Sequence, residues 1–584
     1  MKIKQNCEND TKLNKENRKS VSLNDYIVET GSQQTSEIEW VITKPKQRST
    51  YEIVNEPIKT DEFFSHLQKL ASVIAGYASN PESHNVTADV KPGDIFKKIS
   101  KTGPDNPERF ENVCSDFEHL VLNGLTHWQH PRFHAYFPAG RNYACMLADL
   151  AISSLGVVGF SWDSCPALTE MEHSMTNWVG RALGIPETFL FQEPIESSKG
   201  GGCLLESSSD AIHNVLLASR HRKLGELVGH RKESDVSRDI LQRNHDFCKK
   251  FVVYTSKEAH SSIEKGCKLT MMNCRKIETR VENEFGLTGR EIEIEVLKDI
   301  DSGFIPLHIH VTLGTTSTVA SDHLDTIWPI AKKYNMWIHV DAAYSGSTWI
   351  IPKYRYESRG IEHVDSLNVN AHKLLQHSVG CYPVYLQPTH HNSNDLRDWG
   401  VSLSRRFLCL KSWFVFRLYG IRGLQNYIQN LIDSAIYFEN LVATHPNCRI
   451  FGKRKHALFC FQYVEANLSE HHVNDLTREF CGFVNRSRLM YFTLTKVQEH
   501  VLIRVSVNFE KSTPAIIDDS WRCLKLLIDK FKKMRQILEK SSPPNISFNT
   551  NKSETDKKVE SVFKEDETFR ETHMNSLTQI FSDD

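Results

Sequence analysis

Short apolar runs alternate with helix-like segments through the middle of the chain, and this alternation constrains the fold more than any other feature. The runs have the length of buried strands and lie at residues 251–254, 307–313, 336–340 and 366–369. Residues 322–334, between two of these runs, have helical spacing. Strands separated by helices form βαβ units, which build a mostly parallel sheet covered by helices on both faces. The sequence therefore predicts an α/β domain over residues 146–409.

The flanking regions predict further parts, as expected for 584 residues, a length that exceeds one hydrophobic core. Residues 1–58 and 539–584 are polar and lack apolar periodicity, so both are predicted to be disordered. Helical spacing from Thr60 onward predicts a helical N-terminal segment, which takes residues 59–145. Long helical patterns and strand-like runs follow at residues 421–441, 457–463, 501–507 and 513–538. They predict a small α+β domain over residues 410–538.

Charge and composition argue against several classes of protein. The net charge of −1 gives no general attraction to polyanions, so we expect no nucleic-acid partner. The longest apolar stretch, residues 146–162, is interrupted by Asp149 and falls short of the ~20 residues of a membrane span, which predicts a buried helix and loop. The 14 cysteines lack zinc-like spacing and predict reduced, mostly buried thiols without a metal site. Since the N-terminus also lacks an apolar signal segment, we expect a cytoplasmic protein with no membrane partner.

Reactive side chains follow the ends of the predicted strands. Asp341 ends one run, and Lys373 follows another. His260 and Thr316 follow two further runs. In an open parallel sheet, ligands bind beyond the carboxyl ends of the strands. We therefore expect an acid, a lysine, a histidine and a hydroxyl to meet at one rim of the sheet.

These residue types suit pyridoxal 5'-phosphate (PLP). A lysine forms an imine with an aldehyde, and a carboxylate keeps a pyridine nitrogen protonated, so that the ring accepts electrons. A phosphate binds at the N-terminus of a helix. Three glycines, followed by Ser207, Ser208 and Ser209, precede a helical pattern at residues 211–224. The spacing therefore predicts a PLP site.

Eight segments carry a resemblance to a known family. They read HPRFHAYFP (130–138), GFSW (159–162), SCPALTE (164–170), AHSS (259–262), LGTT (313–316), HVDAAY (339–344), NAHK (370–373) and RRF (405–407). Together they resemble the group II PLP-dependent decarboxylases, which include aromatic-L-amino-acid, tyrosine and histidine decarboxylases. The resemblance extends over residues 60–538. It implies the aspartate aminotransferase-like, type I fold of PLP enzymes, an amino-acid substrate, and a homodimer with shared active sites.

The resemblance also implies roles around the ring of the cofactor. Lys373 looks like the lysine that binds PLP as an imine, and Asp341 resembles the partner of the ring nitrogen. His260 is similar to the histidine that stacks on the ring and meets the substrate carboxylate. Ala343 would pack on the opposite face, and Thr316 would lie beside the ring hydroxyl.

Further residues resemble contacts to the phosphate and the substrate. The expected phosphate ligands are Ser207, Ser208, Ser209, Asn370 and His372. The three serines alone also fit a plain helix cap. The expected aromatic substrate pocket consists of Trp128, Tyr136, Phe137, Val158 and Phe160. Its last two members would come from the partner subunit, and core packing is the alternative for all five. Ala139 and Ser404 differ from many aromatic decarboxylases and favour histidine or another divergent substrate.

One loop departs from the family. Residues 387–404 form an interval on the order of twenty residues shorter than the usual mobile lid, a kind of segment that gates catalysis. The interval contains His390 and His391 but no tyrosine, so the usual proton donor is missing. His372 or a loop histidine is a candidate replacement. In addition, Glu206 stands where a glycine is expected before the serines, and its charge would repel a phosphate if it pointed inward.

Three functions stay open at this point. The first, which we expect, is PLP-dependent decarboxylation of an aromatic-type L-amino acid (histidine, tyrosine, DOPA, 5-hydroxytryptophan or tryptophan) to a biogenic amine. The second is an aldehyde synthase of the same family. The third is a PLP-binding protein with impaired activity and a regulatory role. The shortened loop separates the first from the other two.

Overall fold

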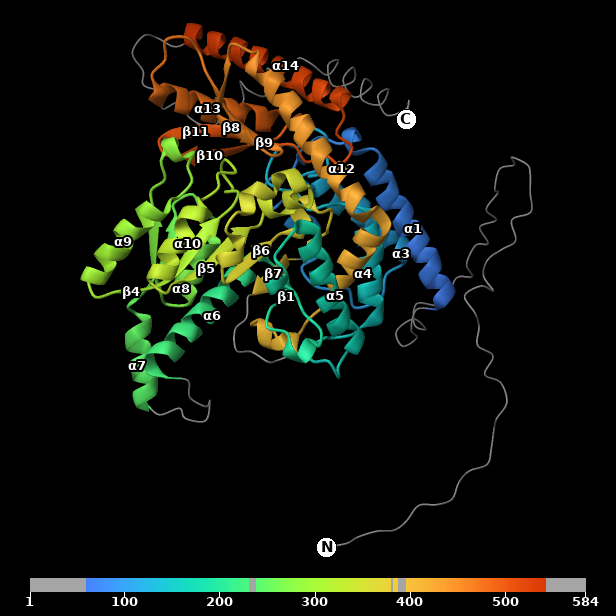
Figure 1. Cartoon of the computed structure of the whole chain (residues 1–584). Coiled ribbons are helices and arrows are strands. Elements are labelled where there is room, and N and C mark those ends of the chain that lie inside the picture. Colours follow the sequence, from blue (N-terminus) through green and yellow to red (C-terminus); the bar gives the residue numbers. More distant parts are fainter. Residues whose placement is uncertain (1–58, 230–237, 380–381, 387–394, 542–584) are drawn as a thin grey trace, which may run out of the picture. The chain divides into compact units, whose positions relative to one another are not determined.

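The computed structural model describes residues 59–229, 238–379, 382–386 and 395–541 (Figure 1). All elements named below belong to one compact unit, which takes in residues 60–102 and the described residues from 109 onward. Of the residues predicted to be disordered, 1–58 and 542–584 lie outside the described residues, whereas residues 539–541 end helix α14 (Pro514–Ser541), so that the prediction is wrong for these three. No helix in the described ranges is long and apolar enough to cross a membrane. None of the described cysteines forms a disulfide with another, and most of them are buried.

The central sheet has seven strands in the order β1-β7-β6-β5-β4-β2-β3. Its strands are β1 Gly201–Leu205, β2 Phe251–Ser256, β3 Asn273–Ile277, β4 Ile305–Thr312, β5 Trp337–Ala342, β6 Ser366–Val369 and β7 Tyr382–Leu386. Strands β2 to β6 pair in parallel, whereas β7 is antiparallel to both of its neighbours. The four predicted strands are β2, β4, β5 and β6, so the predicted α/β sheet is confirmed.

Helices cover both faces of this sheet because alternate strand residues point to opposite sides (Figure 1). Phe251 and Val253 of β2 pack with α6 (Ser208–Val228) and α8 (Ser262–Leu269). Val252 and Tyr254 belong to the other core, with α9 (Gly289–Asp301) and α10 (Leu324–Lys333). Helix α5 (Pro166–Leu183) lies in the same second core. Both cores are buried, which leaves the strand ends as the place for polar chemistry.

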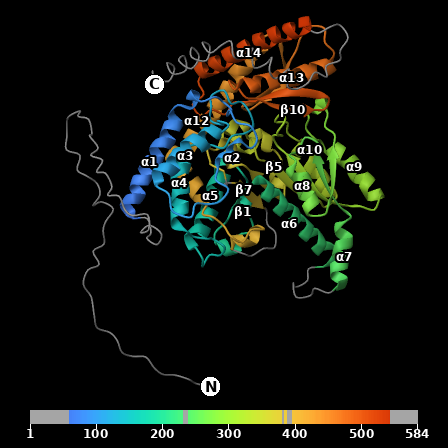
Figure 2. The same ribbon diagram turned by 180° about the vertical axis from the view of Figure 1, so that it is seen from behind.

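A second, antiparallel sheet follows in the chain, with the order β10-β11-β9-β8. Its strands are β8 Cys448–Lys455, β9 Leu458–Tyr463, β10 Thr493–Val497 and β11 His500–Ser506. The long helices near it are α12 Cys409–Ala443, α13 Glu470–Ser487 and α14 Pro514–Ser541 (Figure 2). Gly420 interrupts α12 with a φ of 66°, a left-handed conformation that suits glycine. The predicted C-terminal α+β elements are thus present.

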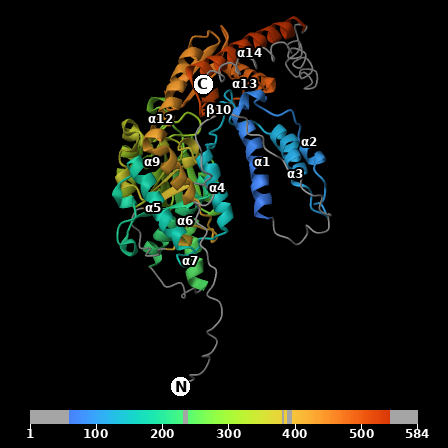
Figure 3. The ribbon, with the colours of Figure 1, turned by 90° about the vertical axis from the view of Figure 1, so that its right-hand side faces the viewer.

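The N-terminal helices leave much of their apolar surface open. They are α1 Thr60–Ser79, α2 Asp94–Lys98, α3 Phe110–Asp116 and α4 Tyr143–Leu155. Helices α1 and α3 run side by side (Figure 3), and the rings of His66 and Phe110 stack with centroids 4.1 Å apart. Helix α1 has no buried residue.

The prediction that residues 146–162 are buried is wrong for much of that stretch. Leu147, Leu155 and Trp162 are about half exposed, at 51%, 53% and 47%. Only one side of α4 packs on the chain's own core, through residues such as Ala148 and Ile152. The opposite side is an apolar face of the kind that marks an interface with another protein.

Candidate active site

The predicted site residues meet where parallel strands end. Asp341 lies in β5 and Thr316 follows β4. His260 follows β2, and Lys373 lies in α11 (Ala371–Leu374), the short helix directly after β6. Ser207 follows β1, which runs parallel to β6 because β7 is antiparallel to both. The strand topology therefore brings the residues of five separated segments to one rim, as predicted.

Lys373 has a pKa suited to attack on a carbonyl. Burial lowers the pKa of Lys373 to about 8, the carboxylate of Asp341 raises it, and the charge of Arg504 lowers it. The Nζ atom lies 4.9 Å from the centre of the Phe137 ring. A lysine with a lowered pKa has a larger neutral fraction at neutral pH, and the neutral amine is the nucleophile.

Asp341 is held as a carboxylate. Its Oδ1 atom accepts hydrogen bonds from the Ala343 backbone N–H (3.0 Å) and from Asn368 Nδ2 (3.2 Å). Burial raises the pKa of Asp341. The charges of His310 and Lys373, with other neighbours, lower it by a larger amount, so the pKa of Asp341 lies below its ordinary value. The shifts in the pKa values of Lys373 and Asp341 are mutual, which places their charges within reach of one another.

The start of α6 offers an anion site. The Ser207 side chain accepts a hydrogen bond from the Asp210 backbone N–H at 3.1 Å and caps the helix. Ser208 Oγ is buried and, among the described residues, has no hydrogen-bond partner. A buried hydroxyl without a partner is costly unless a ligand satisfies it, and a helix N-terminus attracts phosphate. A plain cap therefore accounts for Ser207 but not for Ser208.

Asn370 and His372 begin the helix of the lysine. The Asn370 side chain accepts a hydrogen bond from the His372 backbone N–H at 3.1 Å, and its Nδ2 lies 3.4 Å from His372 Nε2. Burial lowers the pKa of His372 to about 4, helped by the charge of Lys373. The lysine, the ionised acid and the orphaned hydroxyl of Ser208 match the aldehyde, the ring nitrogen and the phosphate of PLP. The residues present thus fit that cofactor.

His260 and Thr316 face a cavity of about 740 Å³, which residues of the β10–β11 hairpin also line. His260 Nδ1 lies 2.8 Å from the Ser262 hydroxyl. Burial lowers the pKa of His260, while Asp341 raises it. Ala343, two residues after Asp341 in the sequence, is buried. Lys373 and Asp341 do not line this cavity, which lies on the side of the exposed His260 imidazole.

The aromatic residues divide into two groups within one chain. Trp128 stacks on Tyr136 with centroids 5.0 Å apart, and Phe137 stacks on Tyr344 at 4.2 Å. Val158 and Phe160 are exposed, at 46% and 39%. Core packing, the alternative role for these two residues, therefore does not account for them.

Of the two remaining predicted residues, Ala139 lies close to His372, because the N–H of the next residue, Gly140, donates to the His372 carbonyl at 3.0 Å. The Ala139 carbonyl accepts a hydrogen bond from Gln129 Nε2 at 2.9 Å. Ser404 lines a separate cavity of about 180 Å³ together with Glu206 and Arg406. Glu206 is exposed there. His390 and His391 lie outside the described residues.

Sequence reasoning missed Arg504. It is 4% exposed on β11, and its guanidinium lies 4.2 Å from the centre of the Phe137 ring. Its Nη2 donates to the Tyr136 carbonyl at 3.2 Å, while its Nε has no partner among the described residues. Burial lowers the pKa of Arg504 to about 10. A lone arginine in the apolar run 501–507 was the signal, because buried charges are rare unless a partner or ligand holds them.

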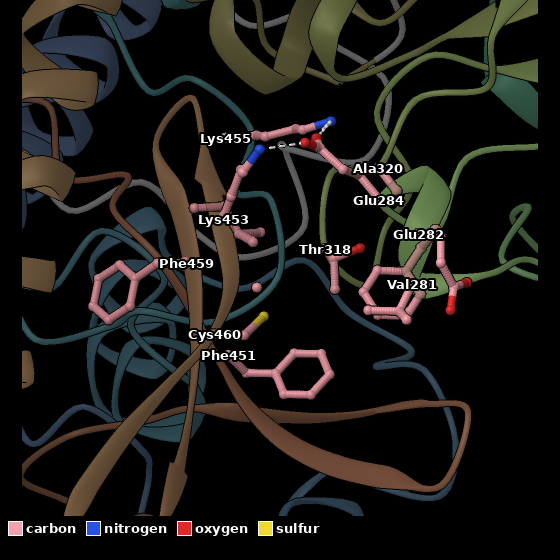
Figure 4. A pocket seen from close by; sticks show the side chains of 13 residues that line it. Val281, Glu282, Glu284, Thr318, Ala320, Phe451, Lys453, Lys455, Phe459 and Cys460 are labelled. Atoms are coloured by element: carbon pink, nitrogen blue, oxygen red, sulfur yellow. Dashed lines mark hydrogen bonds and ion pairs between the residues drawn. The ribbon is translucent and has the colours of Figure 1, made fainter.

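Another pocket, of about 350 Å³, lies apart from these residues (Figure 4). Lys453 and Lys455 from β8 both pair with the carboxylate of Glu284 at its mouth. Phe285 and Phe451 contribute stacked rings with centroids 6.0 Å apart. None of the predicted site residues lines this pocket.

Comparisons with known proteins agree with this geometry. The family model "Pyridoxal-dependent decarboxylase conserved domain" matches residues 92–464. The phenylacetaldehyde synthase of Arabidopsis thaliana is 32% identical over 495 residues, which cover 81% of this chain and 97% of that protein. The aromatic-L-amino-acid decarboxylase of Mus musculus is 32% identical over 480 residues, covering 79% and 96%. The crystal structure of Oryza sativa TDC with PLP and tryptamine has a TM-score of 0.76 and 30% identity, covering 82% of this chain and 99% of that one.

The residues that the family model matches include Asp341 in β5 and Lys373 in α11. The predicted type I fold and the predicted cofactor are therefore confirmed. The chain belongs to the pyridoxal-dependent decarboxylase family.

Proposed function

We propose that the protein decarboxylates an aromatic-type L-amino acid to the corresponding amine. The observation that carries the proposal is the placement of Asp341 in β5 and Lys373 directly after the neighbouring strand β6, where the charge of each shifts the pKa of the other. The similarity to aromatic-L-amino-acid decarboxylase and to TDC supports the substrate class.

Bound PLP supplies an electron sink for the electron pair that remains when carbon dioxide leaves. Lys373 would bind the aldehyde, and Asp341 would hold a proton on the ring nitrogen through Oδ2, since Oδ1 already accepts two hydrogen bonds. Ser208, Ser209 and the N-terminus of α6 would bind the phosphate, together with Asn370 and His372 from the start of α11. His260 and Ala343 would enclose the ring, and Thr316 would bond its hydroxyl.

Arg504 gives the site a way to bind the substrate carboxylate. It is a buried cation whose Nε has no hydrogen-bond partner within the described part of the chain. Its guanidinium and the Lys373 ammonium both lie over the Phe137 ring. A carboxylate would supply the missing acceptor and offset the desolvation of the guanidinium. Tyr136 and Trp128, stacked on each other and partly exposed, would contact the aromatic side chain.

We also propose that the active unit is a homodimer. The exposed apolar faces of α1 and α4 support it, because exposed apolar surface of this extent favours association. Val158 and Phe160, which are exposed on the single chain, would then complete the partner's substrate pocket. Within each subunit, we place domain boundaries at residues 59–145, 146–409 and 410–538. The protein would act in the cytoplasm, without a nucleic-acid or membrane partner.

An aldehyde synthase is the second candidate. The 32% identity to phenylacetaldehyde synthase equals that to the mouse decarboxylase, and residues 387–404 contain no tyrosine. One assay separates the candidates. The purified protein with PLP is given labelled histidine, tyrosine, DOPA, 5-hydroxytryptophan or tryptophan, and carbon dioxide, amine, aldehyde and peroxide are measured.

Amine without peroxide is the expected result, whereas aldehyde with peroxide would establish the second candidate. Cofactor absorbance without any product would defeat both and leave the impaired, regulatory protein. A Lys373→Ala variant should lose the absorbance band of the lysine-bound cofactor, and persistence of that band would refute the assignment of the lysine.

A further inference from the structure

A buried histidine lies directly behind the acid of the site. His310 is in β4, next to β5, and faces His339 in the register of these strands. Its side chain is 0% exposed, and its Nε2 lies 3.8 Å from Asp341 Oδ2. Neither ring nitrogen of His310 has a hydrogen-bond partner among the described residues.

A neutral imidazole carries one N–H and one lone pair, and burying the N–H without an acceptor destabilises the fold. The neighbouring ring of His339 is already engaged, since its two nitrogens lie 2.9 Å from Ser366 Oγ and 2.8 Å from Asn368 Oδ1. Asp341 Oδ2 is therefore the acceptor that His310 faces. The separation exceeds a hydrogen bond by about 1 Å, so the contact in this structure is electrostatic, and a direct hydrogen bond would need the two side chains to approach.

The two oxygens of Asp341 thus have different surroundings. Oδ1 accepts from Ala343 and Asn368, both fixed by the sheet. Oδ2 is opposite His310 and is the oxygen left for the ring nitrogen of the cofactor. A donor at Oδ2 favours the ionised carboxylate and fixes its rotation.

We propose that His310 is a positioning residue for Asp341, which keeps the carboxylate ionised and turned toward the cofactor nitrogen. The inference rests on the proposed function. The groups that face His310 are His339 and Asp341 from β5, His260 from the segment after β2, and His308 two residues earlier on β4. Burial lowers the pKa of His310 to about 4, so it acts as a neutral donor near pH 7.

The test replaces His310 in the holoenzyme and compares it with a matched histidine. His310→Phe keeps the ring and removes the donor, and His310→Leu serves if the phenylalanine variant does not fold. His310→Gln retains an N–H donor. His308→Gln is the control, because His308 lies on the same strand, is equally buried, and has its Nδ1 3.2 Å from Ser219 Oγ instead.

The readout is the nitrogen NMR signal of PLP labelled with ¹⁵N at the ring nitrogen, followed with pH, together with the dissociation constant of PLP. In His310→Phe we expect the pKa of the cofactor's ring nitrogen to fall by about one unit and the dissociation constant of PLP to rise about tenfold, both relative to the wild type. His310→Gln should recover most of both, and His308→Gln should stay within about twofold of the wild type.

Two failures are distinguishable. A wild-type protein that takes up no PLP overturns the proposed function, and this inference with it. A wild type that binds PLP, beside folded His310→Phe or His310→Leu protein with an unchanged nitrogen signal, overturns the inference alone. A loss of equal size in His308→Gln would also overturn it, because the effect would then belong to the buried strand and not to the contact with Asp341.

Discussion

Replacing Arg504 with methionine should make the protein more stable and a worse enzyme. Burial lowers the pKa of Arg504 to about 10, against an ordinary arginine value of about 12.5. At about 1.4 kcal/mol for each pKa unit, the buried charge costs the folded apoprotein about 3 kcal/mol. Because the folded state disfavours the charged form of Arg504, this cost to folding stability is present at all pH values below about 10.

Removing the buried charge relieves this cost, but the variant also loses two favourable contacts. The Tyr136 carbonyl would lose the hydrogen bond from Nη2, and the Phe137 ring would lose a cation. These contacts contribute about 1 kcal/mol each. The free energy of unfolding of the Arg504→Met apoprotein should therefore rise by about 1 kcal/mol. Catalysis should fall, since losing a charged hydrogen bond to the substrate carboxylate costs about 1.5–3 kcal/mol, or about 10- to 100-fold in kcat/KM.

Calorimetry of the apoprotein and steady-state kinetics of the holoenzyme measure the two effects. Arg132→Met is the control, because Arg132 is equally buried but pairs with Asp519 at 2.7 Å. Removing one partner of such a pair leaves a buried charge alone and should destabilise by about 3–5 kcal/mol. The reasoning is refuted if Arg504→Met lowers the unfolding midpoint as much as Arg132→Met, or if its kcat/KM is unchanged.

Three further predictions concern the cofactor and the assembly. Ser208→Ala should weaken PLP binding with little change in stability, whereas Ser207→Ala should cost about 1 kcal/mol of stability through the lost cap. If both variants change PLP binding and thermal unfolding equally, the assignment of Ser208 to the phosphate and Ser207 to the cap is contradicted. The rate at which the apoprotein captures PLP should rise with pH and level off above about 8, as Lys373 loses its proton, and a pH-independent stopped-flow rate between 6 and 9 would exclude this. Leu147→Glu and Leu150→Glu should each turn a dimer into a monomer in analytical ultracentrifugation, because each places a charge on the exposed face of α4. Variants that stay dimeric would show that α4 lies outside the interface.

The sequence predicted the sheet and its rim because both depend on local patterns. Each buried strand is a short apolar run, and the carboxyl end of a strand is a position along the chain, so Asp341 and Lys373 could be placed at one rim without coordinates. Arg504 could not be placed in this way. It reaches Phe137 only because the second sheet brings together residues far apart in the chain, and no local spacing encodes that contact.

Burial was predicted less well at residues 146–162, where one side of α4 is exposed on the single chain. The apolar residues 146–162 have the composition of a core, but composition does not tell whether a side chain packs on its own chain or on a partner. Val158 and Phe160 show the same ambiguity. His310 is a third kind of case: a histidine in an apolar strand reads as a core residue, and only the register between β4 and β5 sets it against Asp341.

The structure also narrows the choice of proton donor to the substrate's α-carbon. His372 was a candidate, but with a pKa of about 4 only about one molecule in a thousand carries the extra proton at pH 7. Burial lowers the pKa of His260 as well. Burial lowers the pKa of Lys373 only to about 8, so an unbound Lys373 amine would be roughly nine-tenths protonated at pH 7. Lys373 is therefore the better donor in the absence of a loop tyrosine.

This assignment predicts how the products change with pH. If Lys373 protonates the α-carbon, the share of amine should fall and the share of aldehyde should rise as the pH passes through about 8, because the lysine then loses its proton. A donor such as His372 would place that change near pH 4 instead. Measuring amine, aldehyde and peroxide from one substrate between pH 5 and 9 decides between them, and a constant ratio over this range would exclude Lys373.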